Sequence, residues 1–308
     1  MDDLSGLKIL ITGANGFLGR QMIDRLRLYD VRVHAVSRNV PPCRDGAQWI
    51  QGDLTNGAWL RELVTGVKPD VIYQLASASL GGQDSEFVLP TFENDLRSTI
   101  NTLLAAKACG TSRVILVASL EEPRHDSRTV SVPSPYAAAK AACTQYGLMF
   151  HQLYDVPVTI LRLFMTYGPG QKSYKLIPYT ISSLLKNQSP KLSSGIRPVD
   201  WVYVQDVITA FLAAAVRMQV VGTVVDIGSG CLVTVRDLVK EIHRQIPEAP
   251  APTFGALPDR VMETVRCADT ETALRTLDWK ATTPISEGLS QTIAWYRAQV
   301  QGDAAVNT

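Results

Sequence analysis

The sequence has almost no net charge and no long apolar run. Its 308 residues include 30 lysines and arginines against 29 aspartates and glutamates, which gives a net charge of +1. This balance offers no electrostatic basis for binding nucleic acid or an anionic membrane surface. No apolar stretch reaches the roughly 18 residues that a membrane span requires, and the acidic start lacks the basic and apolar parts of a secretory signal. We therefore expect a cytoplasmic protein with neither nucleic acid nor a membrane as its partner.

Cysteines and histidines are few, and neither type is clustered. The five cysteines form no CxxC pair, and the four histidines have no metal-ligand spacing. Scattered cysteines in odd number are typical of a reducing compartment rather than of a disulfide framework. The sequence thus predicts free thiols and no metal site.

The first half of the chain alternates strand and helix patterns. Apolar runs such as "LKILITG", "DVIYQLAS" and "RVILVAS" are separated by segments with helical spacing. This alternation predicts an α/β fold, a Rossmann-type doubly wound parallel sheet with helices on both faces.

The composition of the sequence changes near residue 168, where turn-forming residues, prolines and basic residues become frequent. Strand and helix patterns return after that loop-rich stretch. We therefore predict a dinucleotide-binding domain over residues 1–167, to which residues 200–228 return. Residues 168–308 are expected to form mainly a smaller C-terminal substrate-binding lobe.

A glycine-rich turn follows the first predicted strand. In "ITGANGFLGR", Gly13, Gly16 and Gly19 are three residues apart, after a strand and before a helix. Gly13 permits a tight turn, Gly16 lets backbone N–H groups approach a pyrophosphate, and Gly19 allows close helix packing. An anion is stabilised at the helix N-terminus that follows. The turn therefore predicts a dinucleotide site.

Together with "PYAAAK" at 135–140, this GxxGxxG spacing resembles the extended short-chain dehydrogenase/reductase family, specifically its NAD(P)-dependent nucleotide-sugar epimerases, dehydratases and 4-ketoreductases. The resemblance runs nearly end to end, through "GDL", "LASAS", "ENDLRSTINTLLAA", "RLFMTYGPG", "VDWVYVQDVITAF" and "LDWKATTPISEGLSQTIAWYR". It implies that Asn94 takes the place of the family's asparagine. The expected cofactor contacts are Gly13, Asn15, Gly16, Phe17, Leu18, Gly19, Ser37, Arg38, Asp53, Leu54, Leu75, Ala76, Ser77, Asn94, Tyr136, Lys140 and Leu163.

Three residues are expected to carry the chemistry. Tyr136 and Lys140 are four apart on a predicted helix, and so lie on one face. A phenol has a pKa near 10, which a neighbouring ammonium lowers. Ser119 closes the preceding strand and can stabilise a substrate oxygen. The resemblance implies that these three residues are catalytic.

The chain departs from the family at several substrate positions. Where the dehydratases carry Thr-Asp-Glu, this chain has Ser119, Leu120 and Glu121, and leucine cannot donate the proton that water elimination requires. Glu121 is either a base or substrate contact, or an ordinary surface glutamate. The expected substrate contacts are Ser79, Ser119, Leu120, Glu121, Met165, Lys175, Arg197 and Arg260, in which Met165 replaces an asparagine and the cations could hold a diphosphate.

The end of the second strand bears on the choice of cofactor. An acidic residue there would bind the adenosine ribose and repel a 2′-phosphate, but this chain has Ser37 and Arg38. A hydroxyl and a guanidinium suit a phosphate. NADP(H) is therefore favoured, and NAD(H) with Arg38 stacked on adenine is the alternative.

These residues favour NADPH-dependent reduction of a nucleotide-linked 4-keto(-6-deoxy) sugar, with Tyr136 as the proton donor. The alternatives are an NAD(P)-dependent NDP-sugar 4-epimerase and a non-catalytic dinucleotide-binding sensor. The resemblance also implies a homodimer formed through the helices at 95–108 and 136–152.

Overall fold

The computed structural model describes residues 4–42, 46–78, 81–123, 131–262 and 265–306. The chain forms two compact units. Unit 1 comprises Met1–Leu163, Ile208–Ile227 and Glu271–Trp279, and unit 2 comprises Phe164–Val207, Gly228–Thr270 and Lys280–Thr308. The chain thus returns to unit 1 twice after first leaving it.

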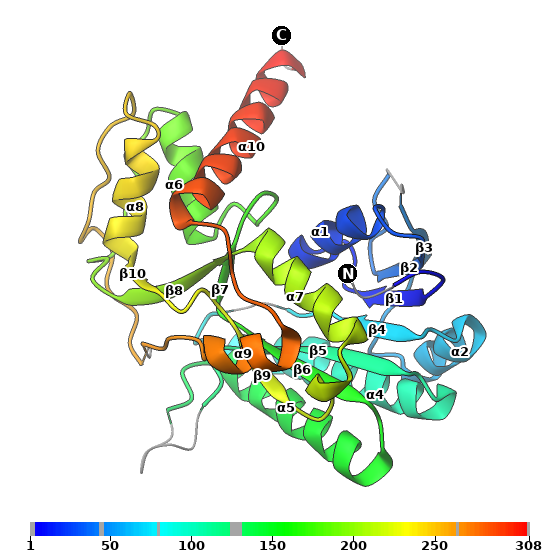
Figure 1. Cartoon of the computed structure of the whole chain (residues 1–308). Coiled ribbons are helices and arrows are strands. Elements are labelled where there is room, and N and C mark those ends of the chain that lie inside the picture. The colour runs from blue at the N-terminus through cyan, green and yellow to red at the C-terminus, as the bar shows by residue number, and fades with distance from the viewer. Residues whose placement is uncertain (1–3, 43–45, 79–80, 124–130, 263–264, 307–308) are drawn as a thin grey trace. The chain divides into compact units, whose positions relative to one another are not determined.

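Unit 1 is built on a seven-stranded sheet in the order β3-β2-β1-β4-β5-β6-β9 (Figure 1). All neighbouring strands pair in parallel. The strands are β1 (Lys8–Thr12), β2 (Arg32–Ser37), β3 (Gln48–Gln51), β4 (Val71–Gln74), β5 (Arg113–Ser119), β6 (Val158–Leu163) and β9 (Val224–Ile227). The predicted Rossmann-type parallel sheet is therefore confirmed.

Helices cover both faces of this sheet (Figure 1). On one face, α2 (Gly57–Val67), α4 (Ser98–Cys109) and α5 (Pro135–Tyr154) join the strands in an apolar core. On the other face, the Tyr73 hydroxyl of β4 donates to the Phe211 carbonyl oxygen (3.1 Å) in α7 (Val204–Val216). Because both faces are covered, β4 and β5 read as nearly continuous apolar runs rather than as alternating ones.

Several shorter elements complete unit 1. They are α1 (Phe17–Leu26), the 3-10 turns η1 (Ser85–Phe87) and η3 (Met218–Val220), α3 (Val88–Thr91), the π-helix η2 (Phe92–Arg97) and α9 (Thr270–Leu277). Helix α5 begins sharply, because Pro135 occupies its first turn and the Ser134 hydroxyl caps the Ala137 N–H (3.1 Å). This cap fixes where Tyr136 lies along the helix.

Unit 2 contains a three-stranded sheet in the order β10-β8-β7. Its elements are β7 (Met165–Tyr167), α6 (Leu176–Leu185), β8 (Pro198–Tyr203), β10 (Leu232–Thr234), α8 (Val235–Arg244) and α10 (Ile285–Val306). The buried Asp200 carboxylate of β8 accepts backbone N–H groups from Ser229 (2.7 Å), Gly230 (3.0 Å) and Ala268 (3.0 Å). One carboxylate thereby fixes two loops of this unit.

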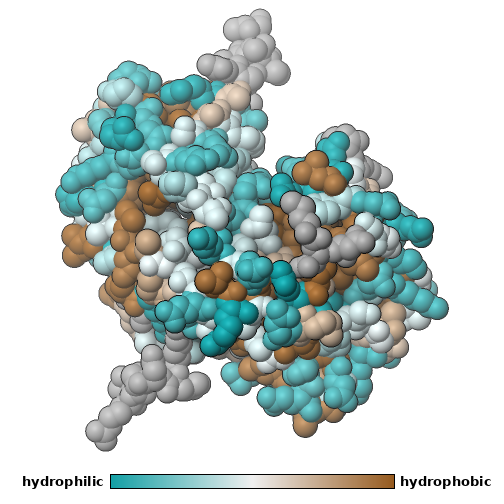
Figure 2. Space-filling view, viewed as in Figure 1, coloured by the Kyte–Doolittle hydropathy of each residue, from teal (hydrophilic) through white to brown (hydrophobic). Residues whose placement is uncertain are grey.

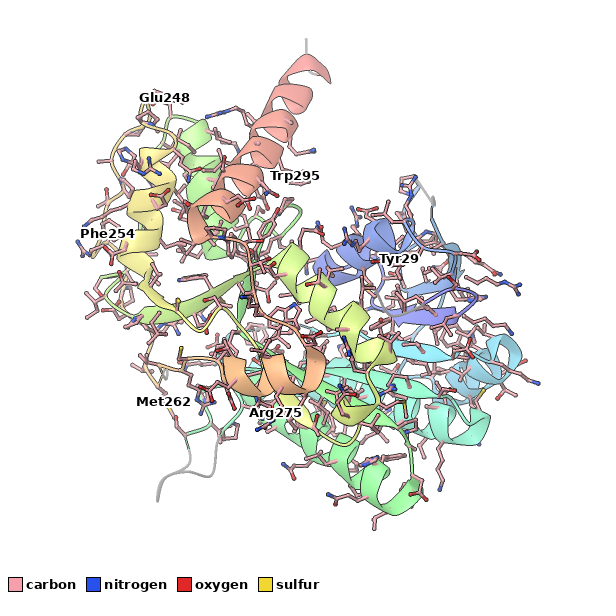
Figure 3. All side chains as sticks on the ribbon, in the orientation of Figure 1. Tyr29, Glu248, Phe254, Met262, Arg275 and Trp295 are labelled. Carbon is pink, nitrogen blue, oxygen red and sulfur yellow. The ribbon has the colours of Figure 1, made fainter. Side chains whose placement is uncertain are left out.

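Helix α8 is strongly amphipathic. Its apolar residues Leu238, Val239 and Ile242 are buried, whereas the visible surface over α8 is hydrophilic (Figure 2). At the first turn, the Arg236 guanidinium lies 4.3 Å from the ring centroid of Phe254, which Figure 3 labels beside this helix. Among the described residues, none of the helices has the length and apolar character needed to cross a membrane.

Candidate active site

The glycine loop joins β1 to α1. Gly13 has φ of +63°, and a Cβ atom there would lie 2.6 Å from the Ala76 backbone. A Cβ atom on Gly19 would lie 2.5 Å from the Ala14 carbonyl oxygen. Among the described residues, no side chain caps the helix at Gly16, and the first turn, which holds Phe17, Leu18 and Gly19, has no acidic residue. The N-terminus of α1 is thus open to an anion, as a dinucleotide pyrophosphate requires.

The end of β2 lies beside this loop. The Asn15 amide donates to the Asn39 carbonyl oxygen (2.8 Å), and Ser37 Oγ accepts the Asn39 N–H (3.3 Å). The exposed Arg38 guanidinium donates to Asn94 Oδ1 (3.0 Å). Four of the predicted cofactor residues, Asn15, Ser37, Arg38 and Asn94, are therefore gathered at one place in unit 1.

The segments after β3 and β4 hold the next predicted contacts. The exposed Asp53 carboxylate accepts the Thr55 N–H and hydroxyl (both 2.9 Å), so it is engaged by its own turn. Leu54 is buried. Leu75, Ala76 and Ser77 follow β4 directly, and Thr12 Oγ1 of β1 accepts the Ala76 N–H (3.3 Å).

Ser119, Tyr136 and Lys140 meet where β5 ends and α5 begins. Ser119 acts on Tyr136 in the direction that lowers the pKa of its phenol, and Ser119 Oγ accepts the Glu121 N–H (3.2 Å). Lys140 Nζ lies 5.8 Å from the Tyr136 ring centroid and donates to the Val117 carbonyl oxygen (3.0 Å). The three predicted catalytic groups thus lie together in one electrostatic cluster that could transfer a proton to a substrate oxygen.

Burial and charge act in opposite directions on the two ionisable members of this cluster. Burial alone would lower the pKa of Lys140, but attraction to Tyr136 and Asp95 outweighs it and raises that pKa. Burial raises the pKa of Tyr136, Lys140 opposes that rise, and the carboxylates of Asp95 and Glu121 add to it. Lys140 therefore acts in the expected direction, but in the protein alone it does not bring the pKa of Tyr136 below its ordinary value.

Leu120 and Glu121 follow the catalytic serine. Leu120 is buried, and its N–H donates to the carbonyl oxygen of Leu163 (3.0 Å) at the end of β6. Its side chain has no ionisable proton to donate. Glu121 is only partly buried and belongs to the charges that act on Tyr136.

Sequence reasoning missed Glu122. This side chain is 2% exposed, and its carboxylate accepts the Ser119 N–H (2.9 Å) and the Thr144 hydroxyl (2.9 Å). Arg162 lies 3.8 Å away. Burial raises the pKa of Glu122, and these hydrogen bonds and Arg162 counteract that rise. A second acidic residue directly after a buried strand was the available signal.

Asp95 is a second residue that the sequence did not predict, although it is the neighbour of the predicted contact Asn94. The two side chains point to different partners, since Asn94 contacts Arg38 while Asp95 lies 3.5 Å from Lys140 Nζ. Both residues lie in η2, a π-helix whose wider turn displaces each following side chain relative to an α-helix. That displacement is not visible in the periodicity of the sequence.

The remaining predicted residues belong to unit 2, except Ser79, which lies outside the described residues. Met165 is half-buried and pairs with Trp201 between β7 and β8. Lys175 precedes α6, with its Nζ 5.6 Å from the ring centroid of Tyr174. Arg197 directly precedes β8, and the exposed Arg260 lies two residues before Met262, which Figure 3 labels.

Metal-ligating side chains do not gather in the described part of the chain, which has no group of three or more histidine, cysteine, aspartate or glutamate residues placed to hold an ion. The described cysteines Cys109, Cys143, Cys231 and Cys267 are free thiols.

The chain is similar to known proteins over most of its length. The chain is 27% identical to a dTDP-D-glucose 4,6-dehydratase of Mus musculus, over 94% of this chain and 88% of that one. It is 26% identical to a UDP-glucose 4-epimerase of Mycolicibacterium smegmatis, over 96% of this chain and all of that one.

The fold is shared with solved structures. The structure of a UDP-glucose 4-epimerase from Thermotoga maritima, determined with UDP-glucose, superposes with a TM-score of 0.87 at 22% identity, covering 96% of this chain and all of that chain. The family model described as the NAD dependent epimerase/dehydratase family matches residues 9–228. The chain therefore belongs to this family, the extended short-chain dehydrogenase/reductases that act on nucleotide sugars with a nicotinamide dinucleotide.

Proposed function

We propose that this protein is a nucleotide-sugar 4-epimerase in which Tyr136 is the acid and base. The proposal rests on the cluster of Ser119, Tyr136 and Lys140 next to Leu120, whose buried side chain has no ionisable proton. Such a cluster can move a proton to and from a hydroxyl oxygen, whereas Leu120 cannot donate a proton to a leaving hydroxyl. The match to a UDP-glucose 4-epimerase over its whole length supports the same conclusion.

In the proposed reaction, Tyr136 removes the proton of the sugar C4 hydroxyl as that carbon loses a hydride. The residues of the glycine loop and the end of β2 would hold a nicotinamide dinucleotide, which supplies reversible hydride transfer. Ser119 donates to the C4 oxygen and stabilises the charge that develops there. After the 4-keto sugar turns over, C4 regains its hydride on the opposite face, and Tyr136 returns the proton to the C4 oxygen.

We propose that residues of unit 2 bind the substrate. Lys175, Arg197 and Arg260 are cations suited to a sugar-nucleotide diphosphate, and Met165 takes the place at which relatives carry an asparagine. Ser79 and Glu121 complete the proposed set. An apolar group at Met165 requires that hydrogen bonds to the substrate come from other residues.

The experiment for this function is incubation of the purified protein with UDP-glucose and no added dinucleotide. We expect formation of the C4 epimer, with no net consumption of NADPH or NADH. Release of a 4-keto-6-deoxy product would indicate a dehydratase instead. No conversion of UDP-glucose or UDP-glucuronic acid would contradict the proposal for these sugars.

A second candidate is net reduction of a 4-keto-6-deoxy sugar nucleotide by NADPH. The observation in its favour concerns the end of β2. Ser37 and the exposed Arg38 lie where an acidic residue would repel the 2′-phosphate of NADPH. The named relatives are a dehydratase and 4-epimerases, so the comparisons support the epimerase better than this reductase. Consumption of NADPH with a 4-keto sugar nucleotide, without epimerisation of UDP-glucose, would favour the reductase.

We propose that the dinucleotide is NADP(H) rather than NAD(H), and Arg38→Ala tests this. Arg38 would bind the 2′-phosphate, so we expect the Kd for NADPH to rise about tenfold, the equivalent of about 1.4 kcal/mol, while the Kd for NADH changes little. Titration calorimetry measures both constants. Arg32→Ala, at the exposed start of the same strand, is the matched control.

Equal weakening of NADPH and NADH binding by Arg38→Ala would mean that Arg38 stacks on adenine instead. Tighter binding of NADH than of NADPH by the unaltered protein would contradict the preference itself. Either result would leave the proposed C4 chemistry in place.

We also propose that the protein is a homodimer formed through the helices at 95–108 and 136–152. Four large apolar or aromatic side chains on these helices or at their ends are exposed, namely Leu104, Tyr146, Leu153 and Tyr154. An exposed apolar face of this kind is typical of a protein interface. The small side chains of Ala138 and Ala142 would allow close approach of two helices, whereas Ala139 is buried within unit 1.

A further inference from the structure

The charge beside Lys140 is the least expected feature of the site. Asp95 is fully buried, with an exposed fraction of 0%, and so it must be compensated. We propose that Asp95 is a positioning residue that fixes the Lys140 ammonium and opposes its effect on the Tyr136 phenol. This role rests on the function proposed above, because it concerns the proton that Tyr136 transfers.

Both oxygens of the Asp95 carboxylate are held in place. Oδ1 accepts the Ser77 hydroxyl (2.5 Å) and lies 3.5 Å from Lys140 Nζ. Oδ2 accepts the Ala78 N–H (3.2 Å). The carboxylate therefore cannot rotate away from Lys140 without losing hydrogen bonds to the segment that follows β4.

Lys140 is constrained from two sides. Its ammonium has three N–H donors, and its side chain is only 4% exposed. One donor is directed to the Val117 carbonyl oxygen of β5 (3.0 Å), and Asp95 of η2 attracts the ammonium from another direction. A carbonyl and a carboxylate on different elements thus define where the ammonium lies relative to Tyr136.

The charges around Tyr136 come from three elements. Lys140 on α5 favours the phenolate, whereas Asp95 on η2 and Glu121 after β5 favour the phenol. Lys140 itself also faces Cys143 on α5 and Glu122 after β5. At Tyr136, the effect of the Lys140 ammonium is therefore opposed by two carboxylates. Lys140 also interacts with further acidic groups.

This balance has a consequence for the direction of proton transfer. A tyrosine kept as the phenol is ready to donate its proton when a C4 carbonyl is reduced, but it must first be deprotonated before it can accept one from a C4 hydroxyl. With a neutral side chain at position 95, Lys140 would favour the phenolate more strongly. Asp95 thus favours the half of the reaction in which the keto sugar becomes a hydroxy sugar.

A purely structural role for Asp95 predicts something different. In that case the carboxylate would only anchor Ser77 and Ala78, and its replacement would change stability without changing the ionisation of Tyr136. The two roles are separated by titrating Tyr136 itself, which requires no sugar substrate.

The test is an ultraviolet titration of phenolate in the full chain saturated with NADP+ or NAD+. Subtracting the curve of the Tyr136→Phe variant isolates the signal of Tyr136. In Asp95→Asn we expect its midpoint to fall by about one pH unit, because a negative charge near the phenol is removed. Asp226→Asn is the matched control, a buried carboxylate of unit 1 that is not among the charges acting on Tyr136, and we expect no shift.

An unchanged or higher midpoint in Asp95→Asn would overturn the inference, as would an equal fall in Asp226→Asn. Asp95→Ser provides a second variant with a smaller uncharged side chain, and the same downward shift is expected. Failure of UDP-glucose epimerisation with a midpoint that falls would reject only the proposed function. Epimerisation with a midpoint that does not move would reject only the role of Asp95.

Discussion

Replacement of Tyr136 by phenylalanine is expected to lower the rate of sugar-nucleotide conversion about 10³-fold, while the protein still binds its dinucleotide. Proton transfer by a positioned side chain contributes on the order of 10²–10⁴ to a rate, and Tyr136 is the group on which Lys140, Asp95 and Glu121 act. The phenyl ring keeps the shape of the side chain but has no proton to transfer. Assays of conversion, with calorimetry of dinucleotide binding, measure both properties.

Tyr146→Phe is the matched control for this variant. Tyr146 lies on the same helix α5 but is exposed, so we expect an unchanged rate. Full activity of Tyr136→Phe would contradict the assignment of Tyr136 as the acid and base. Absence of any conversion by the unaltered protein, combined with normal dinucleotide binding, would favour the non-catalytic sensor.

Replacement of Arg162 by methionine is expected to lower the free energy of unfolding by about 3–5 kcal/mol, the range for breaking a buried ion pair by removing one partner. Arg162 on β6 lies 3.0 Å from Asp226 Oδ1 on β9 and 3.8 Å from Glu122. Both carboxylates are buried. Without the guanidinium, two buried charges would face each other with reduced compensation, and urea unfolding measures the loss.

Arg217→Met serves as the control for this prediction. Arg217 pairs with Asp278 at 3.2 Å in the same unit, but the Asp278 side chain is 72% exposed. Exposed pairs contribute about 0–1 kcal/mol, so a much smaller loss is expected. Equal losses in the two variants would show that the pair of Arg162 with Asp226 is no more important than a surface pair.

The fold could be predicted because its signals are local. The apolar runs of β4 and β5 mark strands buried on two faces, and the glycines of the β1–α1 turn are required by contacts with Ala76 and Ala14. The spacing of Tyr136 and Lys140 on one helix likewise places them on one face. These patterns are recognised from neighbours in sequence, even though the contact of Gly13 with Ala76 joins residues far apart in the chain.

The residues that were missed depend on tertiary structure. Asp95 faces Lys140 because a π-helix alters the direction of the side chains after Phe92, and sequence periodicity does not reveal such a turn. Glu122 follows the end of a strand, where the direction of a side chain is set by packing against α5 rather than by strand alternation. The pKa of Tyr136 is raised by burial and by the Asp95 carboxylate. Both causes depend on how the chain folds around the tyrosine.

The most direct test of the account is the fate of the hydrogen on C4. UDP-glucose carrying deuterium at C4 is incubated with the purified protein, and the epimer is analysed by nuclear magnetic resonance. The proposed reaction removes this hydrogen and returns it to the same carbon on the opposite face, so we predict a C4 epimer that retains deuterium at C4. A C4 epimer without deuterium at that position, or deuterated UDP-glucose recovered without any epimer, would contradict the account.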